Sequence, residues 1–387
     1  MSKAKKFISG NKGEWSEIYV ILELLATGKL YSADKDMNRI DNVFYQILKI
    51  IREESNNSKF EYVVNGSIKI IDGNTKQELL IVETEKFINA ANDFFKLMKE
   101  RGGNSFAMPE FEDFLNEIYI TSKKSKSENK ADITIMIHDA KTNNPTLSFS
   151  IKSLVGQDST LLNPGPGTNF IYKISHPQGK TINTREFNLA TYSGNGRESK
   201  IGRRIKELES IGFEVTFEKI QSETFQLNVE LIDSSLPRIL SYMLLYKYKY
   251  GLKTTKELLD NLKKENPLGF NLSLQHPFYE YKISGLLYDY ALGMTAEKVW
   301  HGIYSATGGI IIVKDSGEVV CYHVYDKNIF QKYLIDNTFF EQASTGEDES
   351  MPGHPRTDKK SKKYFYGWVY EEGGQYFIKL NLQIRFL

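Results

Sequence analysis

The chain has 387 residues and 40% of them are hydrophobic, which is enough for a buried core and excludes a mainly disordered protein. Its 50 Lys and Arg residues nearly balance 49 Asp and Glu residues, so any surface that binds a polyanion must be a local one. A single cysteine, Cys321, excludes an intramolecular disulfide, and without an apolar stretch of about 18 residues we expect a soluble, cytoplasmic protein.

Apolar residues at helical spacing predict helices in both halves of the chain, and β-type runs between turn residues predict strands. Helices are expected over 14–26, 39–52, 85–99, 108–120, 200–210, 236–250, 255–264 and 278–292. Strands are expected over 61–71, 77–83, 131–138, 146–154, 213–220, 224–232, 309–314, 318–325, 364–370 and 375–386. We expect a boundary near Asp233, between a mixed region 1–232 and a helical, then β-rich region 233–387.

The stretch from Ala131 to Leu154 is typical of a β-hairpin, with the turn sequence DAKTNNP between its two strands. Because side chains alternate between the faces of a strand, Asp132, Ser150 and Lys152 should share the polar face. A turn centred on Thr142 would place Asp132 opposite Lys152. A carboxylate and an ammonium group would then meet at one edge of a sheet.

Metal-dependent hydrolysis of a phosphodiester needs this combination of groups. A hard oxygen ligand binds Mg²⁺, and a nearby lysine can act on the attacking water or stabilise the transition state. A second carboxylate would complete the metal site, and Glu17 on the first expected helix is the candidate, followed by Glu14 and then Asp158. The alternatives carry no function: a cross-strand salt bridge between Asp132 and Lys152, and acids that stabilise the dipole of the first helix.

Six further sequence segments point to one known family. They are GNKGEWSE at 10–17, Asp132 with SIK at 150–152, TLLNPGPGTNF at 160–170, GMTAEKVWHG at 293–302, ATGGIIIVKDSGEVVCYHVY at 306–325 and KLNLQIRF at 379–386. Together they cover most of the chain, which resembles type II restriction endonucleases of the HpaII type, within the PD-(D/E)xK nuclease superfamily.

The resemblance implies an α/β fold, with a restriction-endonuclease-like mixed-sheet core flanked by helices and a large helical and β-rich C-terminal elaboration. It implies that Asp132 and Lys152 are active-site residues and that Glu17 is the acid of the first helix. Asp132, Glu17 and the backbone carbonyl of Ile151 would bind the metal, Mg²⁺. The substrate would be double-stranded DNA with a short palindromic target, which for the namesake of the family is CCGG.

One position departs from the superfamily pattern. The residue two before the lysine is normally Asp or Glu, but here it is Ser150, and a serine hydroxyl is a poor metal ligand. Either Glu17 supplies the missing carboxylate, or Ser150 holds a water that binds the metal.

Local positive charge for DNA binding occurs in two segments. Residues 196–206 contain five basic side chains and one acid, and 356–363 is a second basic run. These charges suit phosphate contacts, with a solvated surface as the alternative, and loop Asn, Gln and Arg side chains suit base readout. The resulting DNA-binding candidates are Gln157, Asn163, Asn169, Arg197, Lys200, Arg203, Arg204 and Arg356.

We therefore expect a Mg²⁺-dependent type II restriction endonuclease. Its rivals are a repair or junction-resolving nuclease of the same fold and a catalytically silent DNA-binding protein. The expected partner is double-stranded DNA, with a homodimer as an option and a cognate DNA methyltransferase that protects the host site. No membrane association is expected.

Overall fold

A computed structural model describes residues 8–123, 131–139, 144–156, 158–191, 199–343 and 366–387. The chain divides into two compact units. Unit 1 contains residues 1–159, 291–293 and 303–333, and unit 2 contains residues 160–290, 294–302 and 334–387. The expected boundary near Asp233 lies inside unit 2. The first boundary between the two units along the chain follows Ser159.

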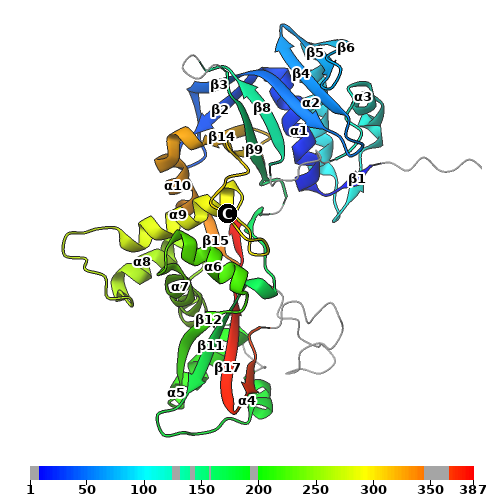
Figure 1. The fold of residues 1–387 in the computed structure, drawn as a ribbon. Helices are drawn as coiled ribbons and strands as arrows, with labels where there is room; N and C mark the ends of the chain where they lie inside the picture. Colours follow the sequence, from blue (N-terminus) through cyan, green and yellow to red (C-terminus); the bar gives the residue numbers. More distant parts are fainter. Residues whose placement is uncertain (1–7, 124–130, 140–143, 157, 192–198, 344–365) are drawn as a thin grey trace, which may run out of the picture. The chain divides into compact units, whose positions relative to one another are not determined.

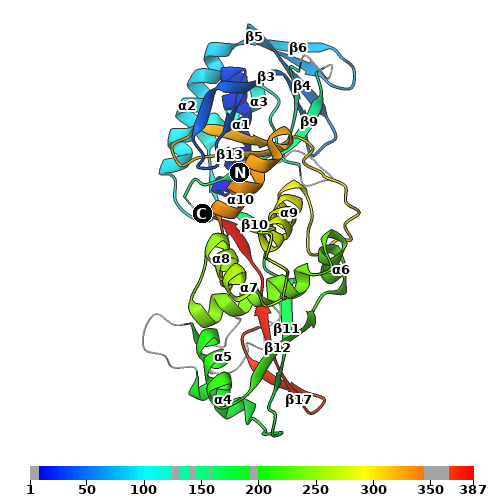
Figure 2. The same cartoon turned by 90° about the vertical axis from the view of Figure 1, so that its left-hand side faces the viewer.

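Unit 1 is built on one mixed sheet, which Figures 1 and 2 show from two sides. In the described part of the chain the strand order is β2-β14-β13-β9-β8-β3-β4-β5-β6, with an additional pairing of β2 with β3. The pairs β13–β9 and β14–β2 are parallel and the others are antiparallel. The strands are β2 (Lys29–Ala33), β3 (Arg39–Glu53), β4 (Lys59–Asn65), β5 (Ser67–Asp72), β6 (Glu78–Glu83), β8 (Ile133–Ile137), β9 (Thr146–Ser153), β13 (Gly309–Val313) and β14 (Val319–His323).

The long strand β3 closes part of this sheet into a ring. Its first half pairs with β2, and its second half pairs with β8 and β4. The ladder therefore passes from β2 through β14, β13, β9 and β8 to β3 and returns to β2.

Helices α1 (Lys12–Thr27) and α2 (Thr84–Glu100) lie against each other and cover the core of unit 1 (Figure 2). Trp15, Ile18 and Leu22 of α1 share this core with Ile135 of β8 and Ile151 of β9. The smaller elements of the unit are β1 (Ser9–Gly10), β7 (Phe106–Ala107), η1 (Pro109–Phe111), α3 (Glu112–Glu117) and η3 (Val324–Asp326). The mixed sheet with flanking helices confirms the α/β class.

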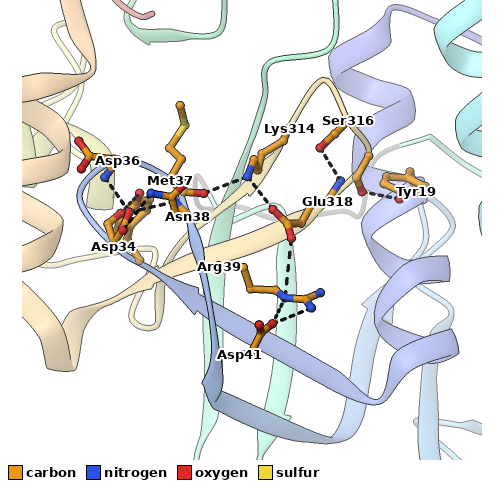
Figure 3. Close-up of polar contacts among 12 residues, drawn as sticks. Tyr19, Asp34, Asp36, Met37, Asn38, Arg39, Asp41, Lys314, Ser316 and Glu318 are labelled. Carbon is orange, nitrogen blue, oxygen red and sulfur yellow. Dashed lines mark hydrogen bonds and ion pairs between the residues drawn. The ribbon is translucent and has the colours of Figure 1, made fainter.

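Polar contacts join the two turns at which the ring closes (Figure 3). Lys314 Nζ, on the β13–β14 turn, donates to the Met37 carbonyl oxygen on the β2–β3 turn at 3.0 Å and pairs with Glu318 at 2.6 Å. Arg39 lies 3.7 Å from the same Glu318 carboxylate. Tyr19 of α1 donates its hydroxyl proton to the Gly317 carbonyl at 2.6 Å, which fixes the helix to this turn.

Two glycines allow β13 to lie close to its neighbours. A Cβ on Gly308 would lie 2.4 Å from the Phe149 ring. Gly309 has φ +124°, and a Cβ there would lie 2.0 Å from the Tyr322 carbonyl oxygen. The ATGG sequence therefore permits the close pairing of β13 with both β9 and β14.

The buried His323 makes the stability of unit 1 dependent on pH. Its side chain is 1% exposed and stacks on Tyr45 with 4.5 Å between ring centroids, and burial lowers its pKa to about 4. The unfolded state, with the ordinary pKa near 6.5, binds the proton first, so the folded state loses stability as the pH falls from about 6.5 to 4. We expect a loss of about 3 kcal/mol that His323→Asn does not show, measured by urea unfolding at pH 7 and pH 4. Parallel losses in both proteins would contradict this assignment.

Unit 2 contains two small sheets, of order β12-β11-β17-β16 and β10-β18-β15. Its strands are β10 (Thr160–Leu162), β11 (Asn169–Ser175), β12 (Glu214–Ile220), β15 (Thr338–Phe340), β16 (Val369–Glu372), β17 (Gln375–Asn381) and β18 (Ile384–Phe386). Its helices are η2 (Pro166–Thr168), α4 (Thr184–Ala190), α5 (Lys200–Ser210), α6 (Glu223–Ile232), α7 (Leu236–Tyr250) and α8 (Thr255–Glu265). Unit boundaries fall within α9 (Phe278–Leu292) and α10 (Lys327–Asp336).

Most of the expected helices are confirmed, but two elements have the wrong type and three others the wrong extent. One of the three is the predicted strand over 375–386, which is divided into β17 and β18 of different sheets. The predicted helix over 39–52 is strand β3, and the predicted strand over 224–232 is helix α6. The predicted strand over 61–71 is a hairpin of β4 and β5 that turns at Gly66, where φ is +73°. The predicted helix over 108–120 is reduced to η1 and α3.

Within the described residues, no helix is both long and apolar enough to cross a membrane.

Candidate active site

The β8–β9 hairpin forms with a register two residues away from the expected one. Ile133 pairs with Phe149, and the Asp132 N–H donates to the Phe149 carbonyl at 2.9 Å. Ser150, rather than Lys152, therefore lies beside Asp132. Because the shift is an even number of residues, it leaves every side chain on the expected face.

Asp132 is held by hydrogen bonds from β9. Its Oδ2 accepts the Ile151 N–H at 2.6 Å and the Ser150 hydroxyl at 3.1 Å. Ser150 is 4% exposed, so its hydroxyl is fixed by burial as well as by this bond. The serine at the position of the usual acid thus orients the neighbouring carboxylate, a role that the sequence pattern did not indicate.

Lys152 is half-buried near the end of β9. It makes no ion pair with Asp132 and no hydrogen bond or ion pair with any other residue that the structure describes. The alternative in which Asp132 and Lys152 form a cross-strand salt bridge is therefore absent from this hairpin. The Lys152 ammonium group, which has no partner among the described residues, remains available to an anionic ligand.

The first two turns of α1 lie beside the end of β9. Ser16 donates its hydroxyl proton to the Ser153 hydroxyl oxygen at 2.8 Å, and a Cβ on Gly156 would lie 2.9 Å from the Lys12 side chain. Glu17 follows the buried Ser16 and is half-buried. The Ser16–Ser153 contact therefore places the backbone of Glu17 near the end of β9, on the face of the strand opposite the Lys152 side chain.

Glu14 stabilises the N-terminus of α1, which was the structural alternative to metal binding for the acids of this helix. It forms a capping box with Asn11, in which each side chain accepts the backbone N–H of the other residue. Its carboxylate also pairs with Lys123 at 2.9 Å. These bonds occupy the Glu14 carboxylate at the helix N-terminus, and Asp158 is exposed beyond β9.

The residues around Asp132 fit a Mg²⁺ ion that retains most of its water. Both hydrogen bonds to the Asp132 carboxylate use Oδ2, so Oδ1 has no hydrogen bond from a described residue and remains available to a cation. Mg²⁺ commonly binds through only one or two carboxylates. Within the described parts of the chain, no three or more His, Cys, Asp or Glu side chains form a group that could hold a metal ion.

Two of the DNA-binding candidates lie in the interior of unit 2. Arg204 is 1% exposed, donates to the Gly367 carbonyl at 2.5 Å and lies over the Trp368 ring at 4.3 Å. Asn169 is also 1% exposed and accepts a hydrogen bond from Asn381 at 2.8 Å. Both side chains are engaged in joining elements of unit 2, which leaves them unsuited to contact DNA.

The other candidates differ in their exposure. Asn163 is exposed, and Lys200 and Arg203 are half-buried on α5. Gln157, Arg197 and Arg356 lie outside the described residues, as does the whole of the second basic run, 356–363.

Comparison with known proteins gives one family. The family model described as HpaII restriction endonuclease matches residues 11–386. The chain is 38% identical over 384 residues to the type II restriction enzyme HpaII of Haemophilus parainfluenzae, covering 99% of each protein. No solved structure gives a significant match to the chain.

Proposed function

The chain belongs to the HpaII restriction endonuclease family, and from this premise we propose that it cleaves both strands of duplex DNA within a short palindromic site, with Mg²⁺ as its metal. Membership makes it a type II, site-specific endonuclease. From the resemblance to this family, we propose CCGG as the target sequence of this chain.

One observation supports this function most directly. The Asp132 carboxylate is fixed by the Ile151 N–H and the Ser150 hydroxyl at the end of the sheet where Lys152 has no partner among the described residues. Fixed geometry reduces the reorganisation that the transition state requires. Such an arrangement is suited to holding a phosphate oxygen and an attacking water in place.

We assign separate roles to the residues at this end of the sheet. Asp132 would hold Mg²⁺ through Oδ1, assisted by Glu17 and the backbone carbonyl of Ile151. The bound ion would supply a positive charge that stabilises the scissile phosphate. Lys152 would donate to a phosphate oxygen or orient the attacking water, and Ser150 would hold Asp132.

Family membership is also the premise for the proposed nuclease core, DNA contacts, cellular location and partners. The sheet of unit 1 would be a PD-(D/E)xK nuclease core, and unit 2 would contribute to DNA recognition. Lys200 and Arg203 on α5 would contact phosphates, and Asn163 would read bases. We further propose a cytoplasmic enzyme that acts as a homodimer, with a cognate DNA methyltransferase protecting the host site.

Digestion of a sequenced plasmid tests the function. With Mg²⁺ the protein should produce discrete fragments, and sequencing of their ends should place every cut at CCGG. EDTA should abolish cutting, and Mn²⁺ should restore it, because both cations accept oxygen ligands.

The other outcomes identify the rivals. Cutting at branched junctions rather than at a fixed sequence would favour a resolving nuclease. Specific binding without any cutting under Mg²⁺ or Mn²⁺ would favour a catalytically silent DNA-binding protein.

A further inference from the structure

Unit 2 contains a cavity of about 960 Å³ whose lining is strongly basic. It lies between the start of α5, the end of α7 and residues 339–342. Six basic residues and one acidic residue line it: Lys200, Arg204, Lys206, Lys247, Lys249, Lys253 and Glu341. One acid does not balance six basic side chains, even though Lys249 has an acidic partner outside the cavity lining, and Glu341 also pairs with Arg385 at 2.9 Å.

Lys247 is the buried cation of this cavity. Its side chain is 8% exposed, and its Nζ has no hydrogen-bond partner in the described parts of the chain. Burial lowers its pKa to about 7, and the charge of Glu341 only partly opposes this shift. Leaving an ammonium group in this state costs stability, which an anion in the cavity would recover.

Compensation of the α7 dipole does not explain Lys247. Lysines in the last turn of a helix can stabilise its C-terminal carbonyls, and Lys247 and Lys249 both lie in that turn. A lysine with that role would donate to a carbonyl oxygen or remain in water, and Lys247 does neither. Lys249, by contrast, pairs with Glu209 at 2.7 Å.

The N-terminus of α5 opens on the same cavity. Ser199 is the N-cap and accepts the Gly202 N–H at 3.0 Å, and Ser199 and Lys200 both line the cavity. A Cβ on Gly202 would lie 2.4 Å from the Tyr248 carbonyl oxygen, so only glycine allows α5 to start this close to the end of α7. The positive end of a helix and the buried Lys247 therefore line one space, and this combination suits the binding of a phosphate.

We propose that this cavity binds a phosphate group of the DNA backbone, with Lys247 and the first turn of α5 as its principal donors. The proposal rests on the function proposed above, which supplies the duplex. The volume far exceeds that of a single phosphate ion, which favours a phosphate carried by a polymer. Lys247 is a positioning contact for the duplex and has no part in cleavage chemistry.

The test compares Lys247→Met with Lys256→Met in the full-length protein. Both changes remove one lysine charge, but Lys256 is an exposed residue of α8 outside the cavity. Binding of a CCGG duplex is measured in EDTA at several salt concentrations. We expect Lys247→Met to weaken binding about tenfold and to lower the slope of log affinity against log salt by about 1, and Lys256→Met to change neither by more than about twofold.

Two further measurements distinguish DNA from free phosphate as the ligand, and a binding role of Lys247 from a structural one. Without DNA, Lys247→Met should unfold at the same temperature as the parent protein or a higher one, because it removes a buried charge. Inorganic phosphate at millimolar concentration should raise the unfolding temperature of the parent and of Lys256→Met, but not that of Lys247→Met.

Three results would overturn the proposal. Unchanged duplex affinity in Lys247→Met would exclude a backbone contact. If phosphate still protected the parent and Lys256→Met but not Lys247→Met, the cavity would bind a free phosphate. A lower unfolding temperature for Lys247→Met would make Lys247 a structural residue. If the parent neither bound nor cut the duplex, the proposed function would fail, and phosphate protection would show separately whether the cavity binds anions.

Discussion

Asp132→Asn and Lys152→Met should each reduce DNA cleavage by at least about 10³-fold while leaving the protein folded. The amide oxygen of Asn can still accept the Ile151 N–H and the Ser150 hydroxyl that Asp132 accepts at 2.6 and 3.1 Å, so the hairpin retains its bonds. It loses the negative charge that would hold a cation. Met retains most of the Lys152 stem and removes only its ammonium group. Plasmid cutting, with thermal unfolding and duplex binding in parallel, measures the effect.

The matched controls come from the same unit. Lys69→Met removes a partly exposed lysine of β5 that pairs with Glu78 at 2.8 Å, a surface pair of little energetic weight, and should cut normally. Glu17→Gln should lose cleavage supported by Mg²⁺ and retain duplex binding. Glu14→Gln should lose only helix-cap stability. Normal cutting by Asp132→Asn or Lys152→Met would remove the proposed site.

The incorrect prediction of a helix over 39–52 has an identifiable physical cause. Ile47 and Ile50 are both buried, a spacing of three that is typical of a helix. In the structure this spacing arises because the pairing of β3 with β8 shifts register between Ile47 and Lys49, which breaks the alternation of a strand. The irregularity depends on the partner strand and could not be predicted from residues 39–52 alone.

The opposite error occurred at α6. Phe225, Leu227, Val229 and Leu231 alternate as in a strand, but the structure buries Phe225, Asn228 and Val229 at helical spacing and leaves the two leucines more than half exposed. The signal that could have corrected the prediction was Ser222, whose hydroxyl accepts the Phe225 N–H at 3.2 Å as an N-cap.

The candidate site was predictable in its residue types but not in its details. Alternation alone assigned Asp132, Ser150 and Lys152 to one face, and the register shift preserved that face. A turn sequence does not determine pairing, so the bond from Ser150 to Asp132 had to come from the structure. For Arg204, the apolar neighbours Ile201, Ile205 and Leu208 at helical spacing were a signal of burial that charge counting overlooked.

The interior of unit 1 also contains an ion pair that secures the end of β3. Arg52 and Glu54 are 2% and 0% exposed, and Arg52 Nε donates to the Glu54 carboxylate at 2.5 Å. Arg52 also donates to the Ser122 carbonyl, and Glu54 accepts the Thr121 hydroxyl proton at 2.9 Å. The pair therefore joins β3 to the segment that follows α3.

Glu54→Ala should lower the free energy of unfolding by about 3–5 kcal/mol, because it leaves the Arg52 guanidinium buried and uncompensated. The double variant Arg52→Met with Glu54→Leu should lose less than Glu54→Ala alone, since it removes both charges and retains apolar volume. Urea unfolding of the parent, of Glu54→Ala and of the double variant measures this difference. Cleavage by the variants, corrected for the folded fraction, should stay near that of the parent, because neither side chain bonds to Asp132 or Lys152. A loss below about 1 kcal/mol for Glu54→Ala would mean that water reaches Arg52 and solvates it.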